Sequence, residues 1–168
     1  MDDEQVTVQM LWDIEQIKQL KARYFRFIDT KDWESFRDLF TEDCQHWVPV
    51  DGEGVEEHAV SNDDYLRTIP AMLHDGITVH HGHMPEIELV NETEATGTWS
   101  MFDLVQVRPA PDSGAAERVS IMGYGHYTET YRKCADGRWR ISSKRNSRLR
   151  VDVLPWDDSD QGGHRHHP

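Results

Sequence analysis

Three histidines within four positions have a type and spacing that suit metal binding or proton transfer. His80, His81 and His83 lie in the stretch TVHHGHMPEIEL, residues 78–89, which also alternates as a strand does. Imidazole side chains bind divalent metals and exchange protons near neutral pH. Because alternate residues of a strand share a face, His81 and His83 point one way and His80 points the other. His80 is therefore considered apart from its neighbours.

The pair His81 and His83, with Glu86 nearby, resembles the metal-binding strand of cupin barrels, in which imidazoles and a carboxylate hold a divalent ion. Cupins are double-stranded β barrels, whereas this chain carries extensive helical patterns ahead of its main sheet. We therefore expect His81 and His83 to be solvated or hydrogen-bonded, and we expect no metal site.

An acid that can face His80 stands at the end of the first predicted helix, in the stretch RYFRFIDTKDW. Asp29 comes where this helix stops, and Tyr24 precedes it by five positions. The helix dipole disfavours an acid at a C-terminus. From these residues alone, the favoured interpretation of Asp29 is a turn residue that accepts backbone hydrogen bonds.

The elements that must position these residues follow from the hydrophobic periodicity. Helices are predicted at residues 11–28, after the junction at residues 30–32, and from Ser61, which with Asp64 resembles a capping box. The segments QHWVPV and VEEHAV, separated by DGEG, predict a short hairpin. Four long strands are predicted at residues 77–90, 94–107, 118–132 and 138–151.

This order of elements predicts one α+β domain over residues 1–154 and a flexible tail at residues 155–168. Long antiparallel strands with helices gathered at one end predict a curved sheet closed by three helices. We expect a cone-shaped α+β barrel with an apolar pocket inside.

Composition sets limits on partners and location. The chain has 168 residues, 37% of them hydrophobic, which is enough to bury a core. A formal charge of −13 argues against nucleic acid and anionic membranes as partners. The N-terminus lacks the features of a signal peptide, and Cys44 and Cys134 lack the spacing of metal or redox sites. We therefore expect a cytoplasmic protein with two ordinary thiols.

Three stretches carry a family resemblance: IKQLKARYFRFIDTKDWESFRDLFTEDC, VHHGHMPEIELVNETEATGTWSMFDLV and GYGHYTETYRKCADGRWRISSKRNSRLR. They resemble the SnoaL-like branch of the nuclear transport factor 2-like superfamily, in particular the group of bile-acid 7α-dehydratase, scytalone dehydratase and lindane dehydrochlorinase. The resemblance covers about residues 8–152. It implies the cone fold and a homo-oligomer, a trimer or a dimer built by sheet contacts.

The resemblance also implies site residues. The Asp–His dyad of this group falls on Asp29 and His80, and the bile-acid dehydratase pattern adds Tyr24 and Asp103. Scytalone dehydratase carries a second histidine near the latter position, where this chain has Val105, so that exact chemistry is not expected here.

A basic residue on the last strand completes the implied set. Strand parity favours Arg145, because a regular strand puts it on the face of Trp139 and Ile141. Arg148 is the alternative.

The chemistry of such a site is proton transfer. A neutral His80 takes a proton from the substrate, and Asp29 fixes the imidazole tautomer and stabilises the imidazolium. Tyr24 donates a hydrogen bond to the enolate oxygen that forms. Asp103 assists a leaving hydroxyl if it is protonated, or pairs with Arg145 if it is ionised. This set of roles requires neither a metal nor an organic cofactor.

We therefore predict a cofactor-independent lyase, such as a dehydratase, or an isomerase. Its substrate is expected to be a hydrophobic cyclic carbonyl or hydroxy compound of steroid, polyketide or aromatic type. Candidate walls of the substrate pocket are the apolar and aromatic strand residues Trp99, Met101, Phe102, Tyr127 and Trp139.

Two other functions remain open. The stretch LFTEDCQHWVPV resembles the small subunit of aromatic-ring dioxygenases, which has this fold and a mainly structural role. A binding protein could use the same pocket without turnover. Converging polar residues favour an enzyme, because buried polar groups destabilise a fold that has no use for them.

Overall fold

The computed structural model of the chain describes residues 6–49, 57–107 and 119–155. Its elements follow the predicted α+β order. They are α1 (Val8–Thr30), α2 (Trp33–Arg37), β1 (Phe40–Pro49), β2 (Glu57–Ser61), α3 (Asn62–Leu73), β3 (Ile77–Leu89), β4 (Glu94–Val107), β5 (Val119–Lys133) and β6 (Trp139–Pro155).

The long helix α1 owes its position to an apolar stripe and two caps. Ile17, Tyr24 and Ile28 recur at helical spacing and are buried. The Thr7 side chain accepts a hydrogen bond from a backbone N–H of the first turn. At the other end Lys31 adopts a left-handed conformation, with φ 61°, and its N–H bonds the last carbonyls. The helix thus stops directly after Asp29 and Thr30.

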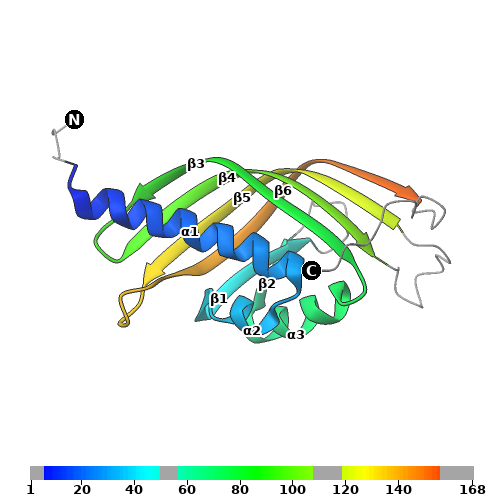
Figure 1. Ribbon diagram of the computed structural model, residues 1–168, viewed down its shortest axis with the longest axis horizontal. Helices are drawn as coiled ribbons and strands as arrows, with labels where there is room; N and C mark the ends of the chain where they lie inside the picture. The colour runs from blue at the N-terminus through cyan, green and yellow to red at the C-terminus, as the bar shows by residue number, and fades with distance from the viewer. Residues whose placement is uncertain (1–5, 50–56, 108–118, 156–168) are drawn as a thin grey trace.

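The strands form one sheet in the order β2-β1-β6-β5-β4-β3. All neighbouring strands are antiparallel except β1 and β6, which are parallel. In Figure 1 the curved sheet arches over α1, while α2 and α3 lie together near β1 and β2. The predicted cone of a curved sheet and three helices is confirmed, but the sheet formed by the described strands stays open and does not close into a barrel.

The hydrophobic core lies between the helices and the inner face of this sheet. Its main cluster joins buried residues of α1, α2 and α3 to those of the strands. A smaller cluster of Trp99, Met101 and Tyr127 packs against Phe25 of α1. The inner face of β4 and β5 is therefore aromatic where α1 crosses it.

A bulge in β6 changes which side chains point inward. Thr130 of β5 pairs with Ser143, but the next residue of β5, Tyr131, pairs with Ile141, so Ser142 is an extra residue. Beyond it Lys144 is buried and Arg145 is exposed. The predicted shared face of Arg145, Trp139 and Ile141 is wrong, because it assumed uninterrupted alternation.

Two sequence predictions fall on undescribed residues. The DGEG connection and all of the tail beyond Pro155 lie outside the residues that the structure describes. Within the described ranges, none of the helices combines the length and apolarity that crossing a bilayer requires.

Candidate active site

Asp29 and His80 meet where the end of α1 lies against β3. Oδ1 of Asp29 is 2.6 Å from Nδ1 of His80, and Oδ2 accepts a hydrogen bond of 2.9 Å from the His80 backbone N–H. The side chains are 23% and 8% exposed, respectively. A carboxylate that holds both the ring and the backbone of a histidine leaves its imidazole little freedom to turn.

A second pair of groups completes the surroundings of this carboxylate. The Thr78 hydroxyl donates to Asp29 at 2.9 Å and accepts at 2.8 Å from Nζ of Lys31. Burial lowers the pKa of Lys31, and the nearby Asp29 opposes that shift. Asp29 thus accepts from the Thr78 hydroxyl and the His80 backbone N–H and also contacts the His80 ring, an environment that suits a carboxylate because it only accepts.

Asp103 lies directly opposite His80 on the neighbouring strand β4. Its carboxylate is buried and forms an ion pair of 2.7 Å with Nη1 of Arg148 from β6. The guanidinium reaches it across Gly123 of β5, where a Cβ atom would stand 1.7 Å from Arg148 and 2.3 Å from Asp103. A larger residue at this position would therefore force one or both charged groups to shift.

Arg148 thus takes the place that strand parity favoured for Arg145. The bulge at Ser142 turns Lys144 and the alternate residues after it toward the inner face, and Arg145 points outward. The partner of Asp103 is therefore the arginine that the sequence left as the alternative.

Tyr24 does not join the dyad. Its hydroxyl lies 3.5 Å from that of Tyr65 of α3, and its buried ring packs against Phe36 and Phe40. Burial, followed by the neighbouring tyrosines, raises the pKa of Tyr24 well above its usual value. Five residues at about 100° each put it roughly 140° around the helix from Asp29. The two side chains accordingly point in different directions.

The predicted pocket walls lie in three different places. Trp99, Met101 and Tyr127 form one buried cluster on the inner face, whereas Phe102 is half-buried and lies tilted against the ring of His81 on the outer face. Trp139 pairs with Lys133 of β5, which is ten residues from Gly123, the residue of β5 opposite Asp103. The Trp139 indole N–H donates a hydrogen bond to Asp13 of α1. At about 3.4 Å per residue, that separation removes Trp139 from the site.

His81 and His83 lie on the outer face. Both are exposed, and their rings contact each other with centroids 5.7 Å apart. His80, between α1 and the sheet, is separated from them by the strand itself.

The sequence analysis missed a buried ion pair on the inner face. Nζ of Lys21 lies 2.5 Å from Oε1 of Glu129, and both side chains are fully buried. The hydroxyl of Tyr131 donates to the other Glu129 oxygen at 2.6 Å and accepts from the Trp99 indole at 2.9 Å. Burial lowers the pKa of Lys21 to about 8, against the opposing effect of Glu129.

The position of Lys21 on the buried face of α1 could have predicted this pair from the sequence. Lys21 occupies the same stripe as Ile17, Tyr24 and Ile28, which are buried. A charged residue on the apolar face of a helix is rarely buried without a partner. That position alone predicts an acid on the facing sheet.

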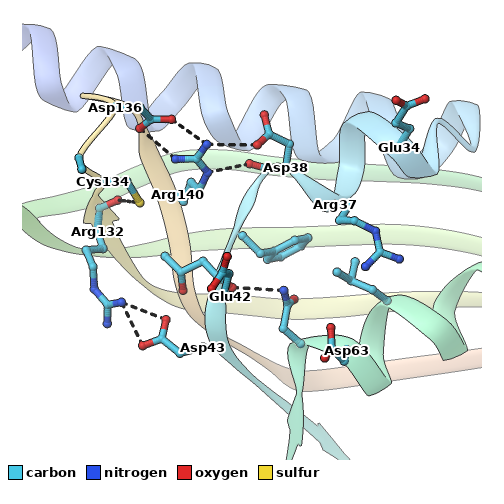
Figure 2. Close-up of a pocket in the computed structure, with 15 residues that line it drawn as sticks. Glu34, Arg37, Asp38, Glu42, Asp43, Asp63, Arg132, Cys134, Asp136 and Arg140 are labelled. Atoms are coloured by element: carbon cyan, nitrogen blue, oxygen red, sulfur yellow. Dashed lines mark hydrogen bonds and ion pairs between the residues drawn. The ribbon is translucent and has the colours of Figure 1, made fainter.

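A charged groove of about 1050 Å³ opens on the other side of β1. Figure 2 shows Arg140 bonded to Asp38 and Asp136, and Arg132 bonded to Asp43. These bonds tie the β5–β6 turn to α2 and β1. Two of its arginines are thus neutralised by acids, and neither Asp29 nor His80 lines the groove. We assign it a structural role.

Comparison with known proteins places this geometry in a family. The sequence model of the SnoaL-like domain matches residues 9–145. A scytalone dehydratase-like protein from Novosphingobium aromaticivorans is 22% identical, with a TM-score of 0.69 over 88% of this chain and 91% of that protein. The hexachlorocyclohexane dehydrochlorinase LinA-type3 from Novosphingobium barchaimii is 18% identical, with a TM-score of 0.66 over 96% and 99%.

A third solved structure has a different description. An aromatic-ring-hydroxylase-like protein from Novosphingobium aromaticivorans is 15% identical, with a TM-score of 0.67 over 87% of this chain and 94% of that protein. At such identities the three structures establish a shared fold, and the reaction must be argued from the site itself.

Proposed function

Since the chain belongs to the SnoaL-like domain family, we propose that it is a lyase or isomerase that moves a proton with Asp29 and His80. The proposal rests on one observation, the contact of 2.6 Å between the carboxylate of Asp29 and Nδ1 of His80. It is supported by solved relatives of the fold whose names denote dehydratase and dehydrochlorinase activity. The proposed substrate is a hydrophobic cyclic carbonyl or hydroxy compound.

The dyad acts first as a base. With Nδ1–H donated to Asp29, Nε2 of His80 carries the lone pair and removes a proton from the carbon beside a carbonyl. The electron pair of that C–H bond passes into an enolate, and Asp29 stabilises the imidazolium that forms. The ion pair of Asp103 and Arg148 lies opposite His80, and the guanidinium has further N–H donors for the enolate oxygen.

The same proton completes either reaction. In an elimination the enolate expels a hydroxyl from the next carbon, and the imidazolium protonates it so that water leaves. In an isomerisation the imidazolium returns its proton to a different carbon. Asp103 is held as a partner of Arg148, so His80 supplies the proton in both cases. The inner cluster of Trp99, Met101 and Tyr127 suits an apolar ring.

Deuterium exchange tests this function before the natural substrate is known. The protein is incubated in D₂O with 1-tetralone and with androst-4-ene-3,17-dione, and deuterium gained beside the carbonyl is measured by mass spectrometry. We expect wild-type protein to accelerate exchange, and His80→Ala and Asp29→Asn to slow it at least 100-fold, within the range of general base catalysis.

Arg145→Ala is the matched control, because it changes an exposed residue on the outer face. It should exchange at the wild-type rate. Equal exchange by wild-type protein and His80→Ala contradicts the enzymatic proposal. That result would favour a binding protein or a structural subunit.

A further inference from the structure

In the part of the chain that the structure describes, the inner face of the sheet carries one more cation than its acids neutralise. Lys21 pairs with Glu129, and Arg148 pairs with Asp103. Lys144, only 4% exposed, also points inward from β6. Among the described residues, no carboxylate forms an ion pair with its ammonium group. A buried charge without a counterion is unfavourable, so the burial of Lys144 needs an explanation.

The neighbours of Lys144 leave most of its hydrogen-bonding capacity unused. Its Nζ lies 3.3 Å from the Asn146 side-chain oxygen, and it stands 5.0 Å from the ring centroid of Tyr65. Glu129 is opposite Lys144 in the sheet, but its two oxygens already accept from Lys21 and Tyr131. An ammonium has three donors, of which one has this single weak acceptor.

A second unused donor belongs to the same face of the sheet, on the neighbouring strand β5. The hydroxyl of Tyr127 is fully buried and has no hydrogen-bond partner among the described residues. Tyr127 pairs with Asn146 across β5 and β6, which makes it a diagonal neighbour of Lys144 on the same face. The ammonium of Lys21 lies 3.7 Å from the centroid of the Tyr127 ring and holds that ring in place.

We propose that Lys144 and Tyr127 form a subsite for a carboxylate group of the substrate. A carboxylate accepts from both an ammonium and a hydroxyl, and its single charge neutralises the excess cation of the inner face. This inference rests on the proposed function, since it assigns the substrate of the same interior to the class of hydrophobic ring compounds with one carboxylate. Trp99 and Met101 pack beside Tyr127 and supply apolar contacts for the ring.

A matched ligand pair tests the subsite. Binding of 1-naphthoate and of its neutral amide, 1-naphthamide, is measured by isothermal titration calorimetry. Wild-type protein should bind the carboxylate at least about tenfold more tightly, since hydrogen bonds to charged groups are the stronger kind. Lys144→Met should abolish that preference, and Tyr127→Phe should reduce it severalfold.

Arg145→Met is the matched control, because it removes one positive charge from the next residue of β6, on the exposed face. It should keep the full preference for the carboxylate. The subsite is overturned if wild-type protein shows no preference, or if Lys144→Met retains it.

The ligand-free protein provides an independent readout. If Lys144 serves a ligand, Lys144→Met should melt at or above the wild-type temperature, because methionine fills the space of the apolar stem and removes an unpaired buried charge. A fall of more than about 5 °C would show that the ammonium serves the fold, and would overturn the proposal.

His80→Ala separates this inference from the proposed reaction. The variant lacks the base but keeps Lys144 and Tyr127, so it should keep the preference for 1-naphthoate. Loss of exchange activity with retained preference supports both proposals. If the wild-type protein prefers 1-naphthoate but does not accelerate deuterium exchange, the subsite is supported and the proposed reaction is contradicted.

Discussion

Asp29 is an acid at the C-terminal end of α1, where the helix dipole makes a negative charge unfavourable. An acid near a helix C-terminus loses about 0.3–1 kcal/mol to the dipole. The Thr78 hydroxyl and the His80 backbone N–H donate to Asp29, and the proposed tautomer of His80 adds the ring N–H as a third donor. Hydrogen bonds to a charged group contribute about 1.5–3 kcal/mol each, so they outweigh the dipole. The carboxylate is held where it serves His80.

His46 is a residue whose burial makes stability depend on pH. It is stacked on Tyr65 with ring centroids 3.7 Å apart, and its Nε2 lies 3.0 Å from the Asn62 side-chain oxygen. Burial, followed by the nearby ammonium of Lys144, lowers the pKa of His46 to about 3. The unfolded chain binds a proton near pH 6.5, whereas the folded chain does not until far lower pH.

Stability should therefore fall as the pH falls from 6.5 toward 3, because the unfolded state takes up the proton. Between pH 7 and pH 5 the contribution of His46 amounts to a loss of about 2 kcal/mol. His46→Gln keeps a side chain that can bond Asn62 but does not titrate. Urea unfolding at the two pH values should show a smaller loss, by about 2 kcal/mol, in the variant. Identical losses in the two proteins would contradict this environment for His46.

At the scale of elements, the extra residue in β6 decides which charges reach the interior. If Ser142 were paired like an ordinary strand residue, uninterrupted alternation from Ile141 would face Arg145 inward and Lys144 outward. With the bulge, Lys144 and Arg148 reach the inner face and meet β5 at Glu129 and Gly123. Serine suits either face of a strand, so the sequence carries no sign of this shift.

Gly123→Ala tests how β5 positions the Asp103–Arg148 pair. The added methyl group would occupy the space of both charged groups, so the pair must separate and leave Asp103 buried without its partner. We expect a loss of about 3–5 kcal/mol in the free energy of unfolding, measured in urea.

The cause can be isolated with a double-mutant cycle. In an Arg148→Met background the pair is already broken, so Gly123→Ala should cost clearly less than it does in the wild-type protein. Full additivity of the two changes would show that the methyl group acts on some other contact.

At the scale of the molecule, the fold was predictable because its periodicities are strong. The stripe of Ile17, Tyr24 and Ile28 indicated α1, and four long alternating runs indicated the main sheet. The resemblance to SnoaL-like proteins indicated the pair of Asp29 and His80, whereas the residues alone favoured a turn role for Asp29. The structure adds what brings them together, namely the left-handed turn at Lys31 that ends α1 beside β3.

Other parts of the site needed the structure. The direction of Tyr24 follows from helix geometry and was open to prediction, as was a partner for Lys21 on the buried stripe. The positions of Lys144 and Arg148 were not, because a bulge is set by how two distant strands pair. Long-range register is the information that local patterns lack.

If Asp29 holds His80 so that Nε2 accepts the proton, the neutral imidazole must carry its hydrogen on Nδ1, and this tautomer can be observed in solution. Long-range ¹H–¹⁵N NMR spectra of histidine-labelled protein, assigned with His80→Gln, report which ring nitrogen carries hydrogen when the imidazole is neutral. We expect hydrogen on Nδ1 in the wild-type protein and a loss of this preference in Asp29→Asn. Hydrogen on Nε2 in the wild-type protein would contradict this arrangement, because that nitrogen could then accept nothing from a substrate.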